Sequence, residues 1–280
     1  MTWQIILLVL AGAMLHAGWN VSVKSSTDKI LETGLIHLFC SIIAMPVAFY
    51  FGAPPKECWP FLIISVLIHL GYYFTLANAY QHGELGLAYP LMRGTAPLFV
   101  AIGSYYFIPE STMSIWGWSG VFLICAGVIL IGISAGLMRH KHAILIAMLN
   151  AILIASYTLA DAAGIRISEN PIQYIASLFA IDGWLFCAWV FLLKKKVAID
   201  YAKKRWAYAL GGASASITSY SIALWAMTVA PVAAIAALRE TSVLFAILFG
   251  AWFLNEKING QRLLSIFMIV LGAMAIRFST

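Results

Sequence analysis

The chain alternates long apolar runs with short polar connections. The apolar runs fill windows of about 20 residues, the length that a helix needs to cross a bilayer at a rise of about 1.5 Å per residue. Ten windows predict ten membrane-spanning helices, at residues 3–23, 31–51, 59–80, 85–107, 115–137, 142–162, 172–193, 206–229, 232–253 and 262–278. No connection is long or polar enough for a soluble domain, so the pattern predicts one all-α membrane unit.

The fourth and ninth windows carry similar sequences. A shift of 146 residues aligns Arg93 with Arg239, and the segment 93–110 with the segment 239–256. Each predicted half, residues 1–137 and 138–280, holds five spans, and an odd number forces the second half to insert upside down. The sequence therefore predicts two inverted five-helix repeats, which suit alternating access around a site near the membrane midplane.

Each repeat places an arginine inside an apolar span. A guanidinium at the bilayer centre costs roughly 2.5 to 3.5 kcal/mol even on lenient insertion scales, so Arg93 and Arg239 need a partner. They either grip acidic groups of a substrate, which the planar guanidinium matches bidentately, or form structural pairs with Glu240 or Asp182. Because two arginines face two carboxylates, a zwitterion is accommodated as readily as an anion.

Other candidate residues cluster on the same spans. Pro90 and Pro97 flank Arg93 and predict a break in the helical ladder there. Glu240 is expected either to receive an amino group or a proton, or to form a salt bridge with Arg93 or Lys24. The remaining candidates are His16, Trp19, Asn20, Tyr89 and Tyr157 as substrate contacts, with Asp161, Asp182 and Lys24 for coupling or gating. For each, ordinary packing or an interfacial position is the alternative.

Composition places this chain in lipid: 62% of its residues are hydrophobic and 10% are charged. A net charge of +6 would suggest nucleic acid in a soluble protein, but in a membrane protein basic residues record topology. Twelve of the 17 basic residues lie in connections after odd-numbered spans: Lys24, Lys29, Arg139, Lys141, Lys194, Lys195, Lys196, Lys203, Lys204, Arg205, Lys257 and Arg262. The positive-inside rule therefore predicts that both termini are non-cytoplasmic. We expect a multi-pass protein of the plasma membrane, here the bacterial inner membrane.

Chemistry beyond binding has little support in the sequence. The four cysteines lack disulfide or metal spacing, and no phosphate loop or HExxH motif occurs, so we expect no cofactor and no metal. The first span lacks the charged segment of a signal peptide and is expected to be retained. Gly117–Gly120 matches a short serine motif of intramembrane proteases, but Ser119 aligns with Ser265 under the same shift, which indicates a repeat position.

Several motifs resemble those of the EamA-like ten-helix transporters of the drug/metabolite transporter superfamily. They are His16–Asn20 with Lys24, Tyr89–Gly94 with Pro97, Asp161–Arg166, and Arg239–Glu240. The resemblance implies a central cavity lined by spans 1 to 4 and 6 to 9, with spans 5 and 10 peripheral. It also implies anion binding by basic residues on spans 4 and 9, as in the related sugar-phosphate translocators. Characterised members often have cytoplasmic termini, opposite to the charge count, so the direction of transport stays open.

These observations predict a secondary transporter, not an enzyme, for a small organic anion or zwitterion of the amino acid, carboxylate or organophosphate/phosphonate type. The alternative is proton-coupled export of a neutral or cationic compound through Glu240. The expected partners are the small molecule, protons or a counter-substrate, and the lipid bilayer, with no nucleic acid. The sequence leaves open whether the chain works alone or as a homodimer.

Overall fold

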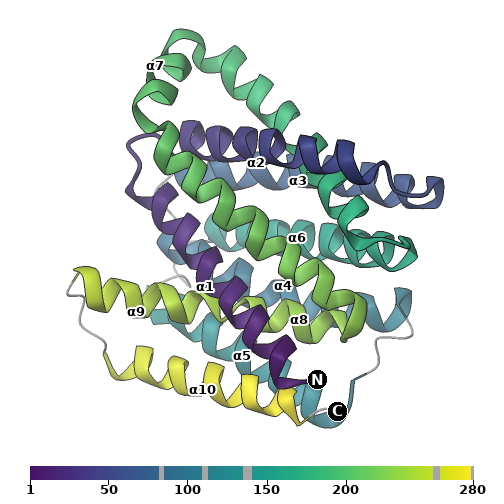
Figure 1. Ribbon diagram of the computed structural model, residues 1–280. Coiled ribbons are helices and arrows are strands. Elements are labelled where there is room, and N and C mark those ends of the chain that lie inside the picture. Colours follow the sequence, from purple (N-terminus) through teal and green to yellow (C-terminus); the bar gives the residue numbers. More distant parts are fainter. Residues whose placement is uncertain (82–84, 109–112, 135–140, 255–258, 279–280) are drawn as a thin grey trace.

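The helices of this protein pack into one bundle, and both chain termini lie together at one edge of it (Figure 1). The structure, a computed structural model, describes residues 1–81, 85–108, 113–134, 141–254 and 259–278. Its helices are α1 (Trp3–Ser25), α2 (Lys29–Phe51), η1 (Lys56–Cys58), α3 (Trp59–Gln81), α4 (Leu85–Phe107), α5 (Ile115–Ser134), α6 (Lys141–Ile167), α7 (Pro171–Val229), α8 (Val232–Arg239), α9 (Ser242–Leu254) and α10 (Gly260–Arg277). The predicted all-helical membrane fold is confirmed.

Local sequence signals explain where several helices begin. The side chain of Asp28 accepts hydrogen bonds from the backbone N–H groups of Ile30 and Leu31 at the start of α2. Asn170 does the same for α7, where Pro171 occupies the first helical position, and Asn259 caps α10. These caps satisfy N–H groups that would otherwise be exposed at the membrane surface.

Helix α7 contains two of the predicted spans. It reverses direction at Lys195, whose backbone (φ 40°, ψ −116°) leaves the helical region, and the two arms form a hairpin (Figure 1). Residues 196–205, which the sequence assigned to a polar connection, are helical and lead directly into the second arm. Lysine, alanine and arginine in this stretch are good helix formers, so a polar connection need not be irregular.

The break in the helical ladder lies in the ninth span and not, as predicted, in the fourth. Helix α4 continues through Pro90 and Pro97, whereas α8 ends at Arg239 and α9 begins at Ser242. A proline removes one ladder hydrogen bond, and α4 remains one continuous helix through that loss where it packs against α5 and α6. The prediction that Pro90 and Pro97 would interrupt the fourth helix was therefore wrong.

Equivalent helices of the two halves run antiparallel, as an inverted repeat requires. On α5, a Cβ added to Gly120 would lie 2.6 Å from the carbonyl oxygen of Gly272, and one added to Gly127 would lie 3.0 Å from that of Ser265. As the residue number rises on α5 it falls on α10. Helix α2 packs against the first arm of α7 in the same sense, because Gly34 lies against Val190 and His37 against Gly183. The inverted halves are confirmed.

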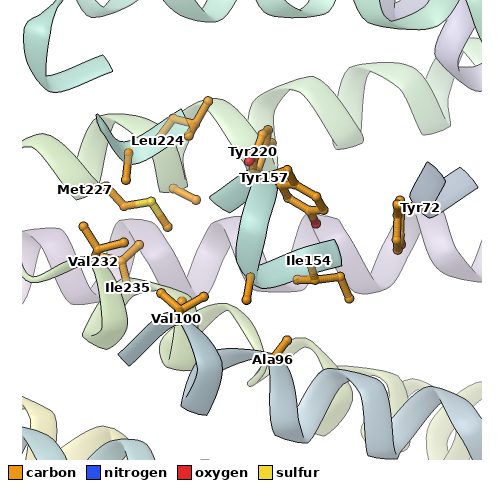
Figure 2. Packing of buried hydrophobic residues seen from close by; sticks show 14 of the residues in the cluster. Tyr72, Ala96, Val100, Ile154, Tyr157, Tyr220, Leu224, Met227, Val232 and Ile235 are labelled. Carbon is orange, nitrogen blue, oxygen red and sulfur yellow. The ribbon is translucent and has the colours of Figure 1, made fainter. Parts of the chain in front are cut away.

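Small and branched apolar side chains fill the centre of the bundle. Figure 2 shows Ala96 and Val100 of α4 facing Ile154 of α6, and Met227 of α7 near Val232 of α8. Packing of this kind, with little polar content, is what drives helix association where lipid offers no hydrophobic gain. Some of the buried polar and charged side chains, among them Arg93, Arg239 and Asp182, gather around a cavity between the halves.

Candidate functional site

A cavity between the two halves is lined by aromatic side chains and by several polar and charged ones. Its volume is about 50 Å³, room for a few water molecules. Its walls come from α1, α2, α3, α4, α6, both arms of α7, and α8, which are the helices that the family resemblance implied. The lining residues are His16, Trp19, His37, His69, Tyr72, Tyr73, Arg93, Tyr157, Leu178, Phe179, Asp182, Ser216, Tyr220 and Arg239.

Arg93 and Glu240 form an ion pair across the two halves. The Nε atom of Arg93 lies 2.6 Å from Oε2 of Glu240, and both side chains are almost completely buried. Arg93 is one of the largest fully buried side chains among the described residues, 1% exposed. This is the salt bridge that the sequence offered as one of two roles for Glu240. It compensates part of the cost of placing a guanidinium at the bilayer centre.

His16 lies between two donors. Its Nδ1 atom is 3.1 Å from Nε1 of Trp19, and its Nε2 atom is 2.9 Å from Nη2 of Arg93. Trp and Arg only donate, and a neutral imidazole has one acceptor nitrogen, so His16 accepts from only one of them at a time. The first-span motif therefore contributes an excess of N–H donors to the cavity wall. Asn20 instead donates to the backbone carbonyl of His16 at 2.7 Å.

Arg239 lies at the break between α8 and α9. The N–H groups of Glu240 and Thr241 donate to the carbonyls of Ala237 and Leu238, three residues back, at 2.9 and 3.1 Å. This short 3₁₀-like step is a common feature of functional sites within helices. The Arg239 guanidinium stacks on the ring of Tyr220, 4.7 Å from its centre, and its Nε atom has no hydrogen-bond partner among the described residues.

Asp182 occupies another part of the cavity wall. The hydroxyl of Tyr73 donates to its Oδ2 atom at 2.5 Å, and Nδ1 of His37 lies 3.1 Å from the same hydroxyl. Its Oδ1 atom is buried and has no hydrogen-bond partner among the described residues. His37 was not a candidate from the sequence, although a histidine inside an apolar span is a signal that could have selected it.

Asp161 is completely buried, whereas the sequence allowed an interfacial position near the end of its span. It accepts hydrogen bonds from the hydroxyls of Tyr174 at 3.0 Å and Tyr220 at 2.6 Å. Asp161 does not line the cavity. Its carboxylate holds Tyr220 in place, and the Tyr220 ring contacts the guanidinium of Arg239. Tyr157 does line the cavity, next to Tyr220 (Figure 2), and stacks on His69 with ring centres 4.0 Å apart. The side chains of Lys24 and Tyr89 lie outside the described residues.

A second group of polar residues, the Glu32 cluster, lies beyond the cavity toward the α1–α2 connection. Glu32 is fully buried and accepts from Arg205 at 3.0 and 3.1 Å, from Tyr201 at 2.6 Å and from Ser22 at 2.9 Å. Burial and the hydrogen bond to Glu32 raise the pKa of Tyr201 to about 12, so this phenol stays protonated and donates. The cluster joins α1 and α2 of the first half to α7 of the second. The sequence analysis did not identify it.

Comparison with known proteins decides the family. The model of the EamA-like transporter family matches residues 3–133 and again residues 141–278. The chain belongs to the EamA-like transporter family. One solved crystal structure superposes on 99% of this chain and 98% of its own with a TM-score of 0.76 and 16% sequence identity, a likeness that shows the fold alone. Curated proteins give no sequence match.

Membership makes this protein a multi-pass membrane transporter rather than an enzyme. The Ser119 hydroxyl is consistent with that assignment, since it donates to the carbonyl of Ile115 on its own helix at 2.8 Å. Helix α5, which carries Ser119, packs against α4 and α10 and contributes no residue to the cavity wall. The two family matches also correspond to the two halves that the arginine repeat indicated.

Proposed function

We propose that this EamA-like transporter is a secondary active carrier of a small organic anion or zwitterion that binds in the central cavity with its acidic group on Arg239. The observation that carries the proposal is the environment of Arg239. Its guanidinium is buried, lines the cavity and is held by the Tyr220 ring, and no described carboxylate lies within 4.0 Å of it. A ligand's carboxylate or phosphonate supplies the counter-charge in bidentate geometry.

The surplus of donors around the cavity supports the same ligand class. Trp19 and Arg93 compete for one acceptor on His16, and Nε of Arg239 has none among the described residues. An oxygen-rich anion accepts from several donors at once, and hydrogen bonds to charged groups contribute about 1.5 to 3 kcal/mol each. A ligand that only donates would leave these groups unsatisfied.

Asp182 extends the proposal to zwitterions. It lines the same cavity as Arg239, so an ammonium group of the ligand has a carboxylate to approach while the acidic group remains on the arginine. Amino acids and aminophosphonates have this charge distribution. Simple carboxylates and organophosphates carry only its negative group.

Transport requires the halves to move. A cavity of about 50 Å³ holds water but not an organic solute, so the helices around it must part to admit one. Inverted halves provide the movement, because exchanging their conformations moves the opening from one side of the membrane to the other. The Glu32 cluster joins the halves on one side of the cavity and would have to separate when that side opens.

The competing function is proton-coupled export of a neutral or cationic compound through Glu240. Its close pairing with Arg93 favours the anion carrier, because a guanidinium 2.6 Å from a carboxylate stabilises the charged form and opposes the uptake of a proton. For orientation we retain the expectation that the α1–α2 connection and residues 194–205 face the cytoplasm. We also propose that the halves meet near residues 137 and 138.

The experiment is a thermal-shift screen of the purified protein against small carboxylates, phosphonates, sulfonates, amino acids and cations. A ligand at 100 times its Kd stabilises the folded state by about 2.7 kcal/mol, so binding is detected without an assumed transport assay. Hits are then tested for uptake into proteoliposomes. We expect stabilisation by anions or zwitterions that is lost in Arg239→Lys and kept in Arg277→Lys, whose guanidinium stacks on Trp3 away from the cavity. Stabilisation by cations alone would favour the competing function.

A further inference from the structure

The carboxyl group of Asp182 is buried without a cationic partner. It is 4% exposed, and in the described part of the chain no arginine or lysine lies within 4.0 Å of it. The nearest basic atom is Nδ1 of His37, at 3.9 Å from Oδ2. An isolated carboxylate in a low-dielectric interior is costly unless it is paired or takes up a proton. Asp182 therefore differs from Glu240, which has Arg93, and from Glu32, which has Arg205.

The hydrogen bonds of Asp182 leave one oxygen ready for a proton. Tyr73 donates its hydroxyl hydrogen to Oδ2, so the Tyr73 oxygen accepts from Nδ1–H of His37, and the three groups form a chain from α2 through α3 to α7. The Oδ1 atom has no partner among the described residues. This atom belongs to a residue that lines the cavity, so water that enters the cavity can deliver a proton there.

Three helices near Asp182 contribute groups that influence its charge. Helix α2 presents His37 and the thiol of Cys40, and α3 presents Tyr73. From α6 the carboxyl group of Asp161 acts electrostatically on Asp182, and the hydroxyls that neutralise part of its charge come from Tyr174 and Tyr220. None of these neighbours supplies a fixed positive charge.

The position of Asp182 links its charge to the relation between the halves. His37 and Tyr73 belong to the first half and Asp182 to the second. Next to it, Gly183 lies so close to α2 that an added Cβ would meet the His37 carbonyl oxygen, and its N–H donates to Ser41 Oγ at 3.1 Å. A movement of α7 relative to the first half therefore changes the contacts of Asp182 with Tyr73 and His37.

We propose that Asp182, positioned by Tyr73 and His37, is a proton-binding site that is separate from the Arg93–Glu240 ion pair and titrates during transport. Its Oδ1 atom takes a proton from water in the cavity and returns it to water on the other side. The structure supports this role for Asp182 rather than Glu240, to which the sequence gave it first.

Protonation of Asp182 removes one negative charge from the wall that also holds Arg239. If an anion binds at Arg239, as in the proposed function, the proton and the anion favour each other's binding. For charges roughly 10 Å apart at an effective dielectric constant of about 20, the effect on anion affinity is on the order of tenfold. Proton and anion are then carried in the same direction.

The proton site is tested without a ligand by infrared spectroscopy of the purified protein across the pH range in which it stays folded. We expect a band from a protonated carboxylic acid that declines as pH rises. It should be absent in Asp182→Asn, shifted in Tyr73→Phe and retained in Asp161→Asn. A band that survives Asp182→Asn, or no titrating band at all, would overturn the proposal.

The link to anion binding is tested with methanesulfonate and with ethanesulfonate, which have no ammonium group and whose sulfonates stay ionised at every working pH, so that a pH effect belongs to the protein. In the wild type, affinity should weaken about tenfold from low to high pH. In Asp182→Asn it should stay at the tighter value throughout, because asparagine imitates the protonated acid. Affinity that is independent of pH in the wild type would overturn the link. If neither sulfonate binds at any pH, the anion site on Arg239 has failed, while the infrared band still decides the proton site.

Discussion

The Nε atom of Arg93 on α4 lies 2.6 Å from Oε2 of Glu240, the residue that follows α8, so a buried ion pair joins the two inverted halves. Arg93 and Arg239 occupy equivalent positions in the repeat, yet only Arg93 has a carboxylate partner among the described residues. The symmetry of the sequence is therefore broken in the fold. Arg93 is paired across the halves, and Arg239 is the arginine to which we assign the ligand in the proposed function.

The pair gives a prediction about stability. Replacing Glu240 with Gln leaves a buried guanidinium without its counter-ion, which should cost about 3 to 5 kcal/mol. Replacing both Arg93 and Glu240 with Met should recover most of that loss, since apolar residues of similar volume often substitute for a buried pair. Thermal unfolding in detergent measures both, with exposed Glu169→Gln as the control. An unchanged melting temperature in Glu240→Gln would contradict the ion pair.

The Glu32 cluster predicts a difference between two ion pairs on the same side. Arg205→Met removes the bidentate partner of a fully buried carboxylate and should destabilise the protein by about 2 kcal/mol or more. The matched control is Lys194→Met, because the pair of Lys194 with Asp28 is partly exposed and should contribute less than about 1 kcal/mol. Equal melting temperatures for the two variants would show that the cluster does not fasten the halves.

The charge bias predicts the orientation. A reporter that is active only in the cytoplasm should work when fused after Lys196 and fail when fused after Thr280, because twelve of the basic residues lie in connections on the side of Lys196. The opposite pattern would reverse the protein in the membrane. It would leave the inverted repeat intact, since the antiparallel pairing of α5 with α10 does not depend on orientation.

Sequence alone was sufficient for the architecture because each span is a long apolar run. Arg93 and Arg239, each inside such a run, mark equivalent positions in the two halves. The sequence was insufficient for the partners of the polar residues. Most spans are apolar on all sides, so periodicity does not reveal how a helix is rotated about its axis. The pairing of Arg93 with Glu240, rather than of Arg239 with Asp182, depends on that rotation.

The position of the helix break could not be predicted from the sequence either. Pro90 and Pro97 are strong breakers in water, yet α4 is continuous, and the interruption at Arg239–Ser242 contains neither proline nor glycine. Neighbouring helices determine whether a helix is interrupted, because in a bilayer their contacts compensate for backbone hydrogen bonds that are lost. For the same reason the Glu32 cluster, whose other members lie 10 to 173 residues from Glu32 in the chain, became visible only in the fold.

Ser119→Ala tests the assignment of α5 to packing. The hydroxyl contacts only its own helix backbone in the described residues, so its removal should leave both ligand-induced stabilisation and proteoliposome uptake within about twofold of wild type. A complete loss of uptake at normal expression would give Ser119 a role that the cavity geometry does not assign to it.

The last prediction separates the roles of the two arginines. Arg239→Lys keeps the charge but loses the bidentate geometry and the stack on Tyr220, so anion affinity should fall by about 1 to 3 kcal/mol, tenfold or more, with little change in the melting temperature of the free protein. Arg93→Lys should instead lower the melting temperature, because the new ammonium reaches Glu240 and His16 less well.

If both arginines contact one ligand, the double variant will lose less affinity than the sum of the two single losses. Independent roles predict additive effects. Affinity for the best anion in the screen and melting temperature, measured across wild type, both single variants and the double variant, distinguish these cases. If affinity is unaltered in Arg239→Lys while Arg277→Lys behaves like wild type, Arg239 is a structural residue and the anion site must be sought elsewhere in the cavity.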